Sequence, residues 1–507
     1  MNMTLVQKIR AVALAAAAVH ATAHAQTAPT MKMTTPIPAS ITTPDSVETR
    51  FGLLKFRDGF PDEATAEKVY DNLDYVRGIE AFLNTMPGAS AEAIRRGFAS
   101  QGADNNQTVL ITEHLMDSNS LFLTPNTESV YNLMWVDTKD GPVVIETPPD
   151  VLGVIDDHWF QYVGDFGRAG PDRGKGGKFL LLPPGYKGDI PEGYIVLRSG
   201  TYGNLVFWRG FLDKSGASNA VANTMKFTKV YRLADAANPP QMKFINVSGK
   251  AFNTVYPNNF HLYEEVNNIV QYEPNESYSP EILGQLASIG IEKGKPFSPD
   301  DRMKKILTEA AAVGNATART IVFRPRESGT YLYPNSAWFT AFVGGNYQFL
   351  SQPGVRDLDA RIHFMYYATA VTPAMALKKV GLGSQYAVAT TDSEGKPLDG
   401  SKTYRIHLPP NIPAKDFWSF VAYDNQTRSM LQTDQQFPSI SSLKKDVVIN
   451  PDTSVDVWFG PTAPKGHEAN WVQTVPNKGW NVLLRLYGPL ESWFDKTWKP
   501  GEFERVS

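Results

Sequence analysis

The sequence predicts a mainly β protein with two antiparallel, jelly-roll-like β-sandwich domains, a helical segment before the first and a helical insert between them. Three observations favour this fold class. The 507 residues include 39 Gly and 36 Pro, which suit many turns and short strands better than a helical bundle. Short apolar runs separated by Gly, Pro and Asp fill two stretches of the chain. Helical spacing of apolar residues is found in the segments around them.

The N-terminus has the pattern of a secretory signal peptide. Lys8 and Arg10 precede a short apolar stretch, and Ala23-His24-Ala25 then forms a cleavage motif. We therefore expect residues 1–25 to be removed and the mature protein to be periplasmic or secreted. Residues 26–48, rich in Thr, Pro, Ala and Met, predict a flexible tether.

Residues 49–235 predict the first domain, a helix followed by a β-sandwich. Apolar residues recur at helical spacing from Pro61 to Asn84, and a shorter helical piece is expected over 91–98. The pattern then changes to short β-type runs bounded by turn residues. We expect strands at residues 130–136, 143–145, 159–163, 179–182, 194–197 and 205–207.

Residues 236–320 predict a helical linker region. One helix is expected over Pro280–Ile291, and a second begins at Ser298 as N-cap with Pro299 at the first helical position. Residues 321–507 predict the second β-sandwich domain. Its strands are expected at residues 403–408, 417–423, 455–459 and 480–487.

Charge and cysteine content exclude several classes of protein. The chain has 52 acidic and 49 basic residues, so nucleic acid is not an expected partner. It has no cysteine, which excludes thiol nucleophiles, thiolate zinc sites and iron–sulfur clusters. After the signal peptide no uncharged apolar stretch is long enough to span a membrane. The expected partner is a small-molecule ligand or substrate, and homo-oligomerisation stays open.

Several motifs resemble a known pair of bacterial families. The C-terminal region contains LDGSKTYRIHLPP from Leu398, DFWS from Asp416 and LRLYGP from Leu484. These motifs resemble the family called domain of unknown function 1214. Upstream, TPNTESVY from Thr124 and the stretch 159–186 resemble its usual partner, domain of unknown function 1254. The resemblance implies two β-sandwich domains with helices between them and a mostly exported location, but no established reaction.

The upstream segments contribute candidate site residues. Family members commonly show Asn-x-Asp-Thr where this chain has Asn126-Thr127-Glu128-Ser129, and Glu128 is a candidate catalytic carboxylate. Asp157 is a second, because it lies in the compact cluster Asp156-Asp157-His158, for which the alternative is a surface or capping role. Tyr131 and Trp159 are candidate substrate-binding residues.

The stretch Gly164–Lys178 combines six glycines with several basic residues. Its backbone amides, together with Arg168, Lys175 and Lys178, suit contact with a carboxylate or phosphate. The alternative is a structural loop packed over the end of a sandwich. The spacing matches neither a P-loop nor a dinucleotide-binding fingerprint.

A second polar patch follows the predicted strand 417–423. Trp418 and Tyr423 are candidate substrate-binding aromatics, Asp424 is a candidate catalytic base, and Arg428 is a candidate clamp for a carboxylate. The alternative is an internal ion pair between the last two residues that fixes a turn.

The leading functional hypothesis is a hydrolase or lyase acting on a small organic substrate in an aromatic-lined cleft. The alternative is a non-catalytic periplasmic ligand-binding or envelope protein, so the sequence leaves open whether the protein is an enzyme. Ser441 and Lys444 match S-x-x-K, but a pattern with two fixed positions arises by chance in a long chain, and a solvated loop is the favoured interpretation. No cofactor is indicated and no metal ligands are assigned, because H-E-x-x-H is absent, but a divalent metal stays open.

Overall fold

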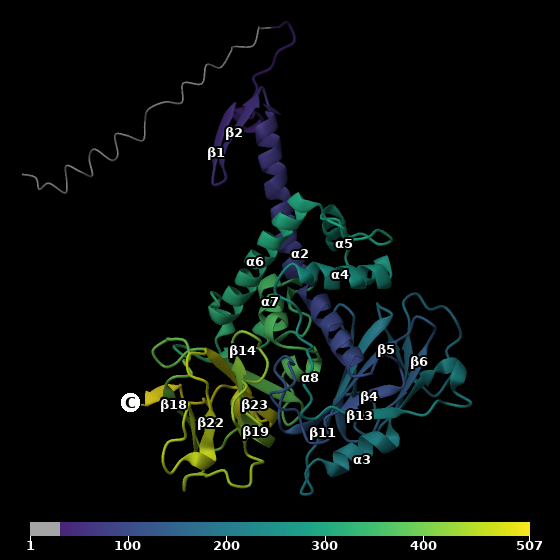
Figure 1. Cartoon of the computed structure of the whole chain (residues 1–507), viewed down its shortest axis with the longest axis vertical. Coiled ribbons are helices and arrows are strands. Elements are labelled where there is room, and N and C mark those ends of the chain that lie inside the picture. Colours follow the sequence, from purple (N-terminus) through teal and green to yellow (C-terminus); the bar gives the residue numbers. More distant parts are fainter. Residues whose placement is uncertain (1–30, 507) are drawn as a thin grey trace, which may run out of the picture. The chain divides into compact units, whose positions relative to one another are not determined.

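The computed structural model describes residues 31–506 and divides into two compact units, one ending at Leu73 and the other beginning at Asp74 (Figure 1). The predicted signal peptide lies outside the described residues. The first unit contains the 3₁₀ turn η1 (Ala39–Ile41) and the antiparallel sheet β1 (Ser46–Thr49), β2 (Gly52–Arg57) and β3 (Phe60–Pro61). Helix α2 (Glu63–Ser100) begins in this unit.

The first part of the second unit contains two sheets. A six-stranded sheet has the order β13 (Lys243–Asn246), β4 (Thr108–Ile111), β5 (Ser129–Asp137), β11 (Gly203–Phe211), β7 (Val151–Asp157) and β8 (Tyr162–Gly167). A four-stranded sheet has the order β10 (Ile195–Arg198), β9 (Lys178–Leu182), β6 (Val143–Glu146) and β12 (Lys229–Arg232). Val206 and Trp208 of β11 share one hydrophobic core with Ile145 of β6 and Leu181 of β9. The two sheets therefore stabilise each other by burying apolar area between them.

The C-terminal part is built in the same way. A five-stranded sheet has the order β14 (Phe339–Thr340), β17 (Ser384–Ala389), β23 (Trp480–Pro489), β19 (Ala414–Asp424) and β20 (Ser439–Ser441). A four-stranded sheet has the order β22 (Trp471–Gln473), β21 (Val455–Gly460), β18 (Thr403–Leu408) and β24 (Glu504–Val506). Leu484 and Leu486 of β23 lie in one core with Ile406 and Val457. A short hairpin, β15 (Leu350–Gln352) and β16 (Val355–Arg356), stands apart from both sheets.

Helices connect and flank the sheets. They are α3 (Ser218–Phe227), α4 (His261–Tyr272), α5 (Pro280–Ser288), α6 (Asp301–Phe323), α7 (Leu358–Tyr367), α8 (Pro373–Ala376) and α9 (Glu491–Phe494). Short 3₁₀ turns are η2 (Leu233–Asp235), η3 (Asn275–Ser277), η4 (Ser328–Thr330), η5 (Val343–Gly345) and η6 (Glu468–Asn470). In Figure 1 the blue and the yellow strands of the second unit lie below the teal and green helices α4 to α7.

The predicted fold class is confirmed in part. The sheets are antiparallel apart from the parallel pairs β13–β4, β10–β9 and β21–β22. The content is mixed rather than mainly β, because α2 has 38 residues and α6 has 23. The N-cap of α6 is Asp300, whose side chain accepts a hydrogen bond from the Met303 N–H, and not the predicted Ser298.

Helix α2 is longer than predicted. The sequence indicated an end at Asn84 and a separate piece from residue 91, but the helix continues through Pro87 to Ser100. A proline inside a helix removes one backbone hydrogen bond and costs about 3 kcal/mol. Packing offsets this cost, since residues 81–94 of α2 are buried. At Gly88 a Cβ atom would lie 2.5 Å from the Trp159 ring, so only glycine allows this close contact.

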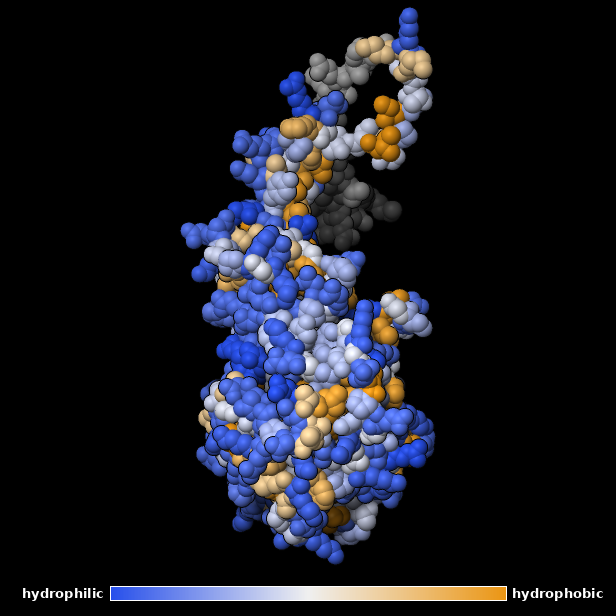
Figure 2. Space-filling view, turned by 90° about the vertical axis from the view of Figure 1, so that its right-hand side faces the viewer, coloured by the Kyte–Doolittle hydropathy of each residue, from blue (hydrophilic) through white to orange (hydrophobic). Residues whose placement is uncertain are grey.

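The surface is mostly hydrophilic where Figure 2 displays it, and its hydrophobic residues lie in small scattered groups. Isolated apolar residues are normal on a folded protein. Among the described residues, no helix is both long and apolar enough to cross a membrane.

Candidate functional site

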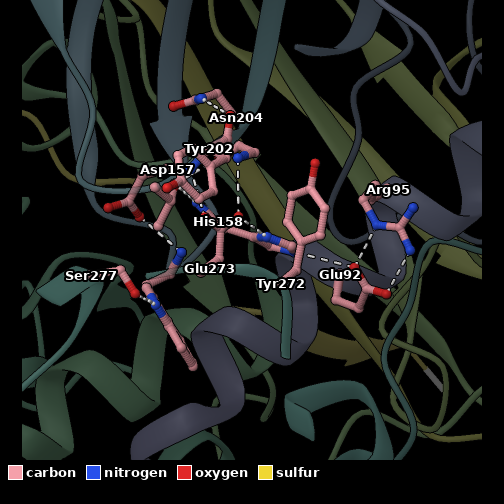
Figure 3. A network of polar contacts seen from close by, with 12 residues as sticks. Glu92, Arg95, Asp157, His158, Tyr202, Asn204, Tyr272, Glu273 and Ser277 are labelled. Carbon is pink, nitrogen blue, oxygen red and sulfur yellow. Dashed lines mark hydrogen bonds and ion pairs between the residues drawn. The ribbon is translucent and has the colours of Figure 1, made fainter. Parts of the chain in front are cut away.

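His158 is the centre of a buried network of polar side chains (Figure 3). Its Nδ1 lies 2.8 Å from Glu273 Oε1, and its Nε2 lies 3.2 Å from Glu92 Oε2. Arg95 binds the same carboxylate of Glu92 through two hydrogen bonds of 2.6 and 2.8 Å. Glu273 also accepts the backbone N–H groups of residues 202–203, at 2.6 and 3.0 Å. The network joins α2, the turn after β7 and the end of α4.

The charges of this network balance. Burial opposes a charge on His158, but its hydrogen bonds to the carboxylates of Glu273 and Glu92 raise its pKa above the ordinary value. Burial likewise opposes a charge on Glu92, but hydrogen bonds from Arg95 and His158 lower its pKa to about 2. Two carboxylates thus face the guanidinium of Arg95 and an imidazole whose charged form they favour. Because both ring nitrogens of His158 are engaged, neither is free to act as a base or to bind a metal, and the network is a structural tie.

The candidate Asp157 stabilises the turn between β7 and β8. Its Oδ1 accepts the N–H groups of Trp159 and Gln161, at 2.9 and 2.8 Å, and its Oδ2 accepts Gln161 Nε2 at 3.0 Å. Burial raises the pKa of Asp157 to about 7, against the effect of these hydrogen bonds. The structure therefore places it in the capping role that the sequence left open.

A second buried cluster lies where β11 and β23 approach each other. It surrounds a pocket of about 30 Å³, roughly the share of one water molecule. Each strand contributes one buried arginine, Arg209 from β11 and Arg485 from β23. We call this site the arginine pocket. Its other polar lining residues are Thr124, Tyr131, Tyr367, Thr369, Tyr386 and Tyr487.

The two arginines have few partners. Arg209 is 7% exposed, and its Nη1 donates to the Tyr487 hydroxyl at 3.3 Å and its Nη2 to Met375 Sδ at 3.9 Å. Arg485 is 2% exposed, and its Nη2 donates to the carbonyl of Thr124 at 2.6 Å. Within residues 31–506, Nε of Arg209 and Nη1 of Arg485 have no hydrogen-bond partner, and neither residue forms an ion pair.

The arginine pocket is positively charged. Arginine remains protonated in proteins, so burial does not neutralise either guanidinium. Glu128 interacts electrostatically with Arg485, but burial raises the pKa of Glu128 and favours its uncharged form. Its carboxyl accepts hydrogen bonds from the backbone N–H and the hydroxyl of Thr127. Burial also raises the pKa of Tyr131, so this phenol keeps its proton. The pocket thus offers hydrogen-bond donors and positive charge.

The predicted residues of the C-terminal patch do not meet at one point. Tyr423 lies beside the arginine pocket, where the guanidinium of Arg485 is 5.6 Å from the centre of its ring. Asp424 forms an ion pair with Lys478, with 2.5 Å between Oδ2 and Nζ. Arg428 instead donates to the carbonyl of Tyr366 at 2.9 Å. The alternative of an ion pair between Asp424 and Arg428 is therefore wrong, because each has a separate partner.

The remaining sequence candidates lie elsewhere. Trp418 packs in the C-terminal core. In the glycine-rich stretch, Arg168 pairs with Asp150 at 2.7 Å, Lys178 lies 3.5 Å from Glu146, and Lys175 is exposed. Arg168 and Lys178 of the glycine-rich stretch thus lie next to different acidic residues and do not form one anion-binding site.

The side chains of Ser441 and Lys444, the two residues of the S-x-x-K pattern, have separate hydrogen-bond partners. Lys444 Nζ donates to the carbonyl of Ala469 at 2.7 Å, and the Oγ of Ser441 accepts the N–H of Leu443 at 3.3 Å. Each side chain has its own loop partner. No three His, Asp or Glu side chains of the described part of the chain come together in a way suited to a metal ion.

Sequence reasoning missed the two arginines as a pair. Arg485 stands inside the motif LRLYGP, and Arg209 interrupts the apolar run of β11. A lone charge in a buried strand was the available signal, since such residues are almost never buried without a reason. Their convergence depends on the tertiary structure.

The comparison with family models separates the two regions. Residues 105–233 match the model described as DUF1254, a protein of unknown function, and residues 383–491 match DUF1214, also of unknown function. The two matches confirm the resemblance. Arg209 lies in the DUF1254 region and Arg485 in the DUF1214 region, so the arginine pocket joins the two.

Solved structures show the fold alone. The crystal structure of the VPA0106 protein from Vibrio parahaemolyticus is similar, with 17% identity, a TM-score of 0.50, and coverage of 86% of this chain and 100% of that chain. An uncharacterized protein from Burkholderia cenocepacia has 12% identity and a TM-score of 0.40, covering 87% of this chain and 96% of that one. None of the curated proteins compared with the chain matches it.

Proposed function

We propose that the protein binds a small organic anion in the arginine pocket, between its DUF1254 and DUF1214 regions. The observation that carries this proposal is the pair of buried guanidiniums that form no ion pair within the described residues. Burying an unpaired charge costs several kcal/mol. Arg428 is also buried without an ion pair in the described residues, but only Arg209 and Arg485 line one shared pocket. An anionic group that pairs with these two guanidiniums supplies the missing partner.

The lining favours ligand binding over hydrolysis. Its polar members are arginine, tyrosine and threonine, and it includes no histidine or carboxylate that could activate a nucleophile. A lyase is the second candidate. A guanidinium can pair with a carboxylate of the substrate, and a neighbouring phenol can then transfer a proton to or from the substrate. Tyr487, which accepts from Arg209, supplies such a phenol.

Compartment and domain limits are part of the same proposal. An exported ligand-binding protein fits the signal-peptide pattern, with cleavage after Ala25 and a periplasmic or secreted location. The proposed limits remain 49–235 for the first domain, 236–320 for the linker region and 321–507 for the second domain. The shared core of each pair of sheets supports describing both domains as β-sandwiches. Mass spectrometry of the mature protein tests the cleavage, which gives Gln26 as the first residue.

The proposed ligand class is tested by anion-dependent thermal stability. The purified protein is titrated with four small anions, sodium formate, acetate, bicarbonate and nitrate, at constant ionic strength. We expect at least one anion to raise the melting temperature of the wild type, because ligands that bind only the folded state stabilise it. Arg209→Met and Arg485→Met should each abolish the rise, since each removes a charge from the pocket.

A matched control is Arg428→Met. Arg428 is 1% exposed and lies over the rings of Tyr256 and Tyr366, so it is also a buried arginine among tyrosines, but it does not line the pocket. The control variant should keep the full response to the anion even if its melting temperature in buffer falls. No response from the wild type to any of the four anions, or a response that survives both pocket substitutions, would contradict the proposal.

A further inference from the structure

An open cleft of about 570 Å³ lies on the other side of helix α7 from the arginine pocket. Leu358, Arg361 and Met365 of α7 line the cleft, whereas Phe364 and Tyr367 line the pocket. With 3.6 residues per turn, the two sets are centred about 120° apart around the helix axis, so they lie on different faces of α7. The cleft is thus a separate cavity with its own chemistry.

Phenol rings form one part of the cleft wall. Tyr162, Tyr278 and Tyr347 are all partly exposed there. The rings of Tyr162 and Tyr347 meet edge to face, with centroids 5.1 Å apart and an interplanar angle of 75°. Trp159 stacks behind Tyr278 at 4.3 Å and is itself only 2% exposed. Trp159, the candidate substrate-binding residue, therefore packs behind the wall, and the tyrosine rings form the wall of the cleft.

Two arginines form another part of the wall. Arg361 is 8% exposed, its Nη2 donates to Asn84 Oδ1 at 2.7 Å, and its Nε has no partner among the described residues. Arg356 is exposed, and its Nη1 donates to the carbonyl of Gln348 at 2.7 Å. Burial, with a contribution from the charge of Arg356, lowers the pKa of Arg361. The acid of the lining, Glu276, is exposed and forms no ion pair with either arginine in the described chain.

We propose that this cleft is a second binding site, whose ligand is an aromatic carboxylate. Its ring packs among Tyr162, Tyr278 and Tyr347, because aromatic rings favour offset-stacked and edge-to-face contacts with one another. Its carboxylate pairs with the guanidinium of Arg361, which lines the cleft and whose planar fork matches the two carboxylate oxygens. The few charged groups amid aromatic walls have the composition of a small-molecule site.

The ligand class is tested by calorimetric titration of the full-length mature protein with three probes. Benzoate has both the ring and the charge, benzamide has the ring alone, and cyclohexanecarboxylate has the charge on a saturated ring. We expect benzoate to bind at least tenfold more tightly than benzamide and several-fold more tightly than cyclohexanecarboxylate. Equal affinity for benzoate and benzamide would overturn the role of the charge, and equal affinity for the two carboxylates would overturn the aromatic class.

Variants assign the binding to the cleft. Arg361→Met should weaken benzoate binding at least tenfold, whereas the buried control Arg428→Met should leave it unchanged. Tyr347→Leu provides a second test at a partly exposed position and should weaken binding several-fold. Unchanged affinity in both cleft variants would overturn the proposal.

The same titrations separate the cleft from the arginine pocket. The Arg209→Met variant should bind benzoate with the wild-type affinity, whereas Arg361→Met should bind it more weakly. Loss of all benzoate binding in Arg209→Met would assign the ligand to the arginine pocket and overturn the second site. Conversely, retained binding in Arg209→Met with no anion response of the pocket would support the cleft while contradicting the function proposed above.

Discussion

The His158 network and the arginine pocket are both buried clusters of charge in the same compact unit, yet their partners differ. In the network, each carboxylate and each cation has an oppositely charged partner within 3.2 Å. In the pocket, Arg209 donates to a hydroxyl and a sulfur atom, and Arg485 donates to a backbone carbonyl. Each guanidinium also has a nitrogen without a hydrogen-bond partner in the described residues. The comparison shows that paired charges tie segments together around His158, whereas the two pocket guanidiniums have no oppositely charged partner in the described residues, which is the feature that the proposed anion would complement.

The largest expected effect breaks the satisfied cluster. His158→Leu leaves Glu92 and Glu273 buried without their shared partner, and removal of one member of a buried ion pair costs about 3–5 kcal/mol. Urea unfolding at pH 7 should show a loss of this size. The control His261→Leu replaces an exposed histidine and should change the free energy of unfolding by less than about 0.5 kcal/mol. A loss below about 1 kcal/mol for His158→Leu would show that the network does not hold the fold.

The pH dependence of stability sharpens the same comparison. The folded pKa of Glu92 is about 2, below its ordinary value of 4.5, so its ionised form stabilises the folded state by about 3 kcal/mol at neutral pH. This stability is present above pH 4.5 and is lost as the pH falls toward 2. The raised pKa of His158 acts in the opposite direction, because its contribution is lost as the pH rises through the folded value. Glu92→Gln should therefore be less stable than the wild type at pH 6 and approach it at pH 2.5, as measured by urea unfolding. An equal difference at both pH values would refute the Glu92 assignment.

Substitution in the unsatisfied cluster should have the opposite sign. Arg209→Met keeps a side chain of similar length and removes an unpaired buried charge, so the ligand-free protein should gain about 1–2 kcal/mol. Equilibrium unfolding in a buffer free of organic anions measures the gain. A loss greater than about 1 kcal/mol would mean that Arg209 is a structural residue like those around His158.

The smallest effect is expected outside both clusters. Lys175 is exposed in the glycine-rich stretch, and it lines neither the arginine pocket nor the cleft. Lys175→Ala should change the free energy of unfolding by less than about 0.5 kcal/mol and leave the anion response of the melting temperature intact. A lost anion response in this variant would return the glycine-rich stretch to the list of ligand-binding segments.

The sequence predicted strands best where apolar residues run without interruption. Strands β5, β11 and β23 lie where their apolar runs indicated, and Leu484 and Leu486 are both in the core. Strand β7 was missed, because Gly153 and the acids at its end weaken the pattern. Helix α2 continued past Pro87 because tertiary packing outweighs local propensity, and no local signal reports that packing.

The candidate sites were harder to predict than the strands. Tyr131 was identified and lines the arginine pocket, and Trp159 was identified and supports the cleft. Glu92 and Glu273 were missed, because their partner His158 is 66 residues from one and 115 from the other. Arg209 is 278 residues from Tyr487, its hydrogen-bond partner in the strand of the DUF1214 region that completes the pocket. Contacts over such separations exist only in the folded chain, so residue spacing could not reveal them.

The two pocket arginines come from different regions of the chain, which constrains how the gene can evolve. One comes from the DUF1254 region and the other from the DUF1214 region. A gene that lost either region would encode an incomplete lining with a single guanidinium. Recombination that exchanged one region for a distant counterpart would also have to preserve the other side of the pocket. The pocket thus gives selection a reason to keep the two regions together on one chain.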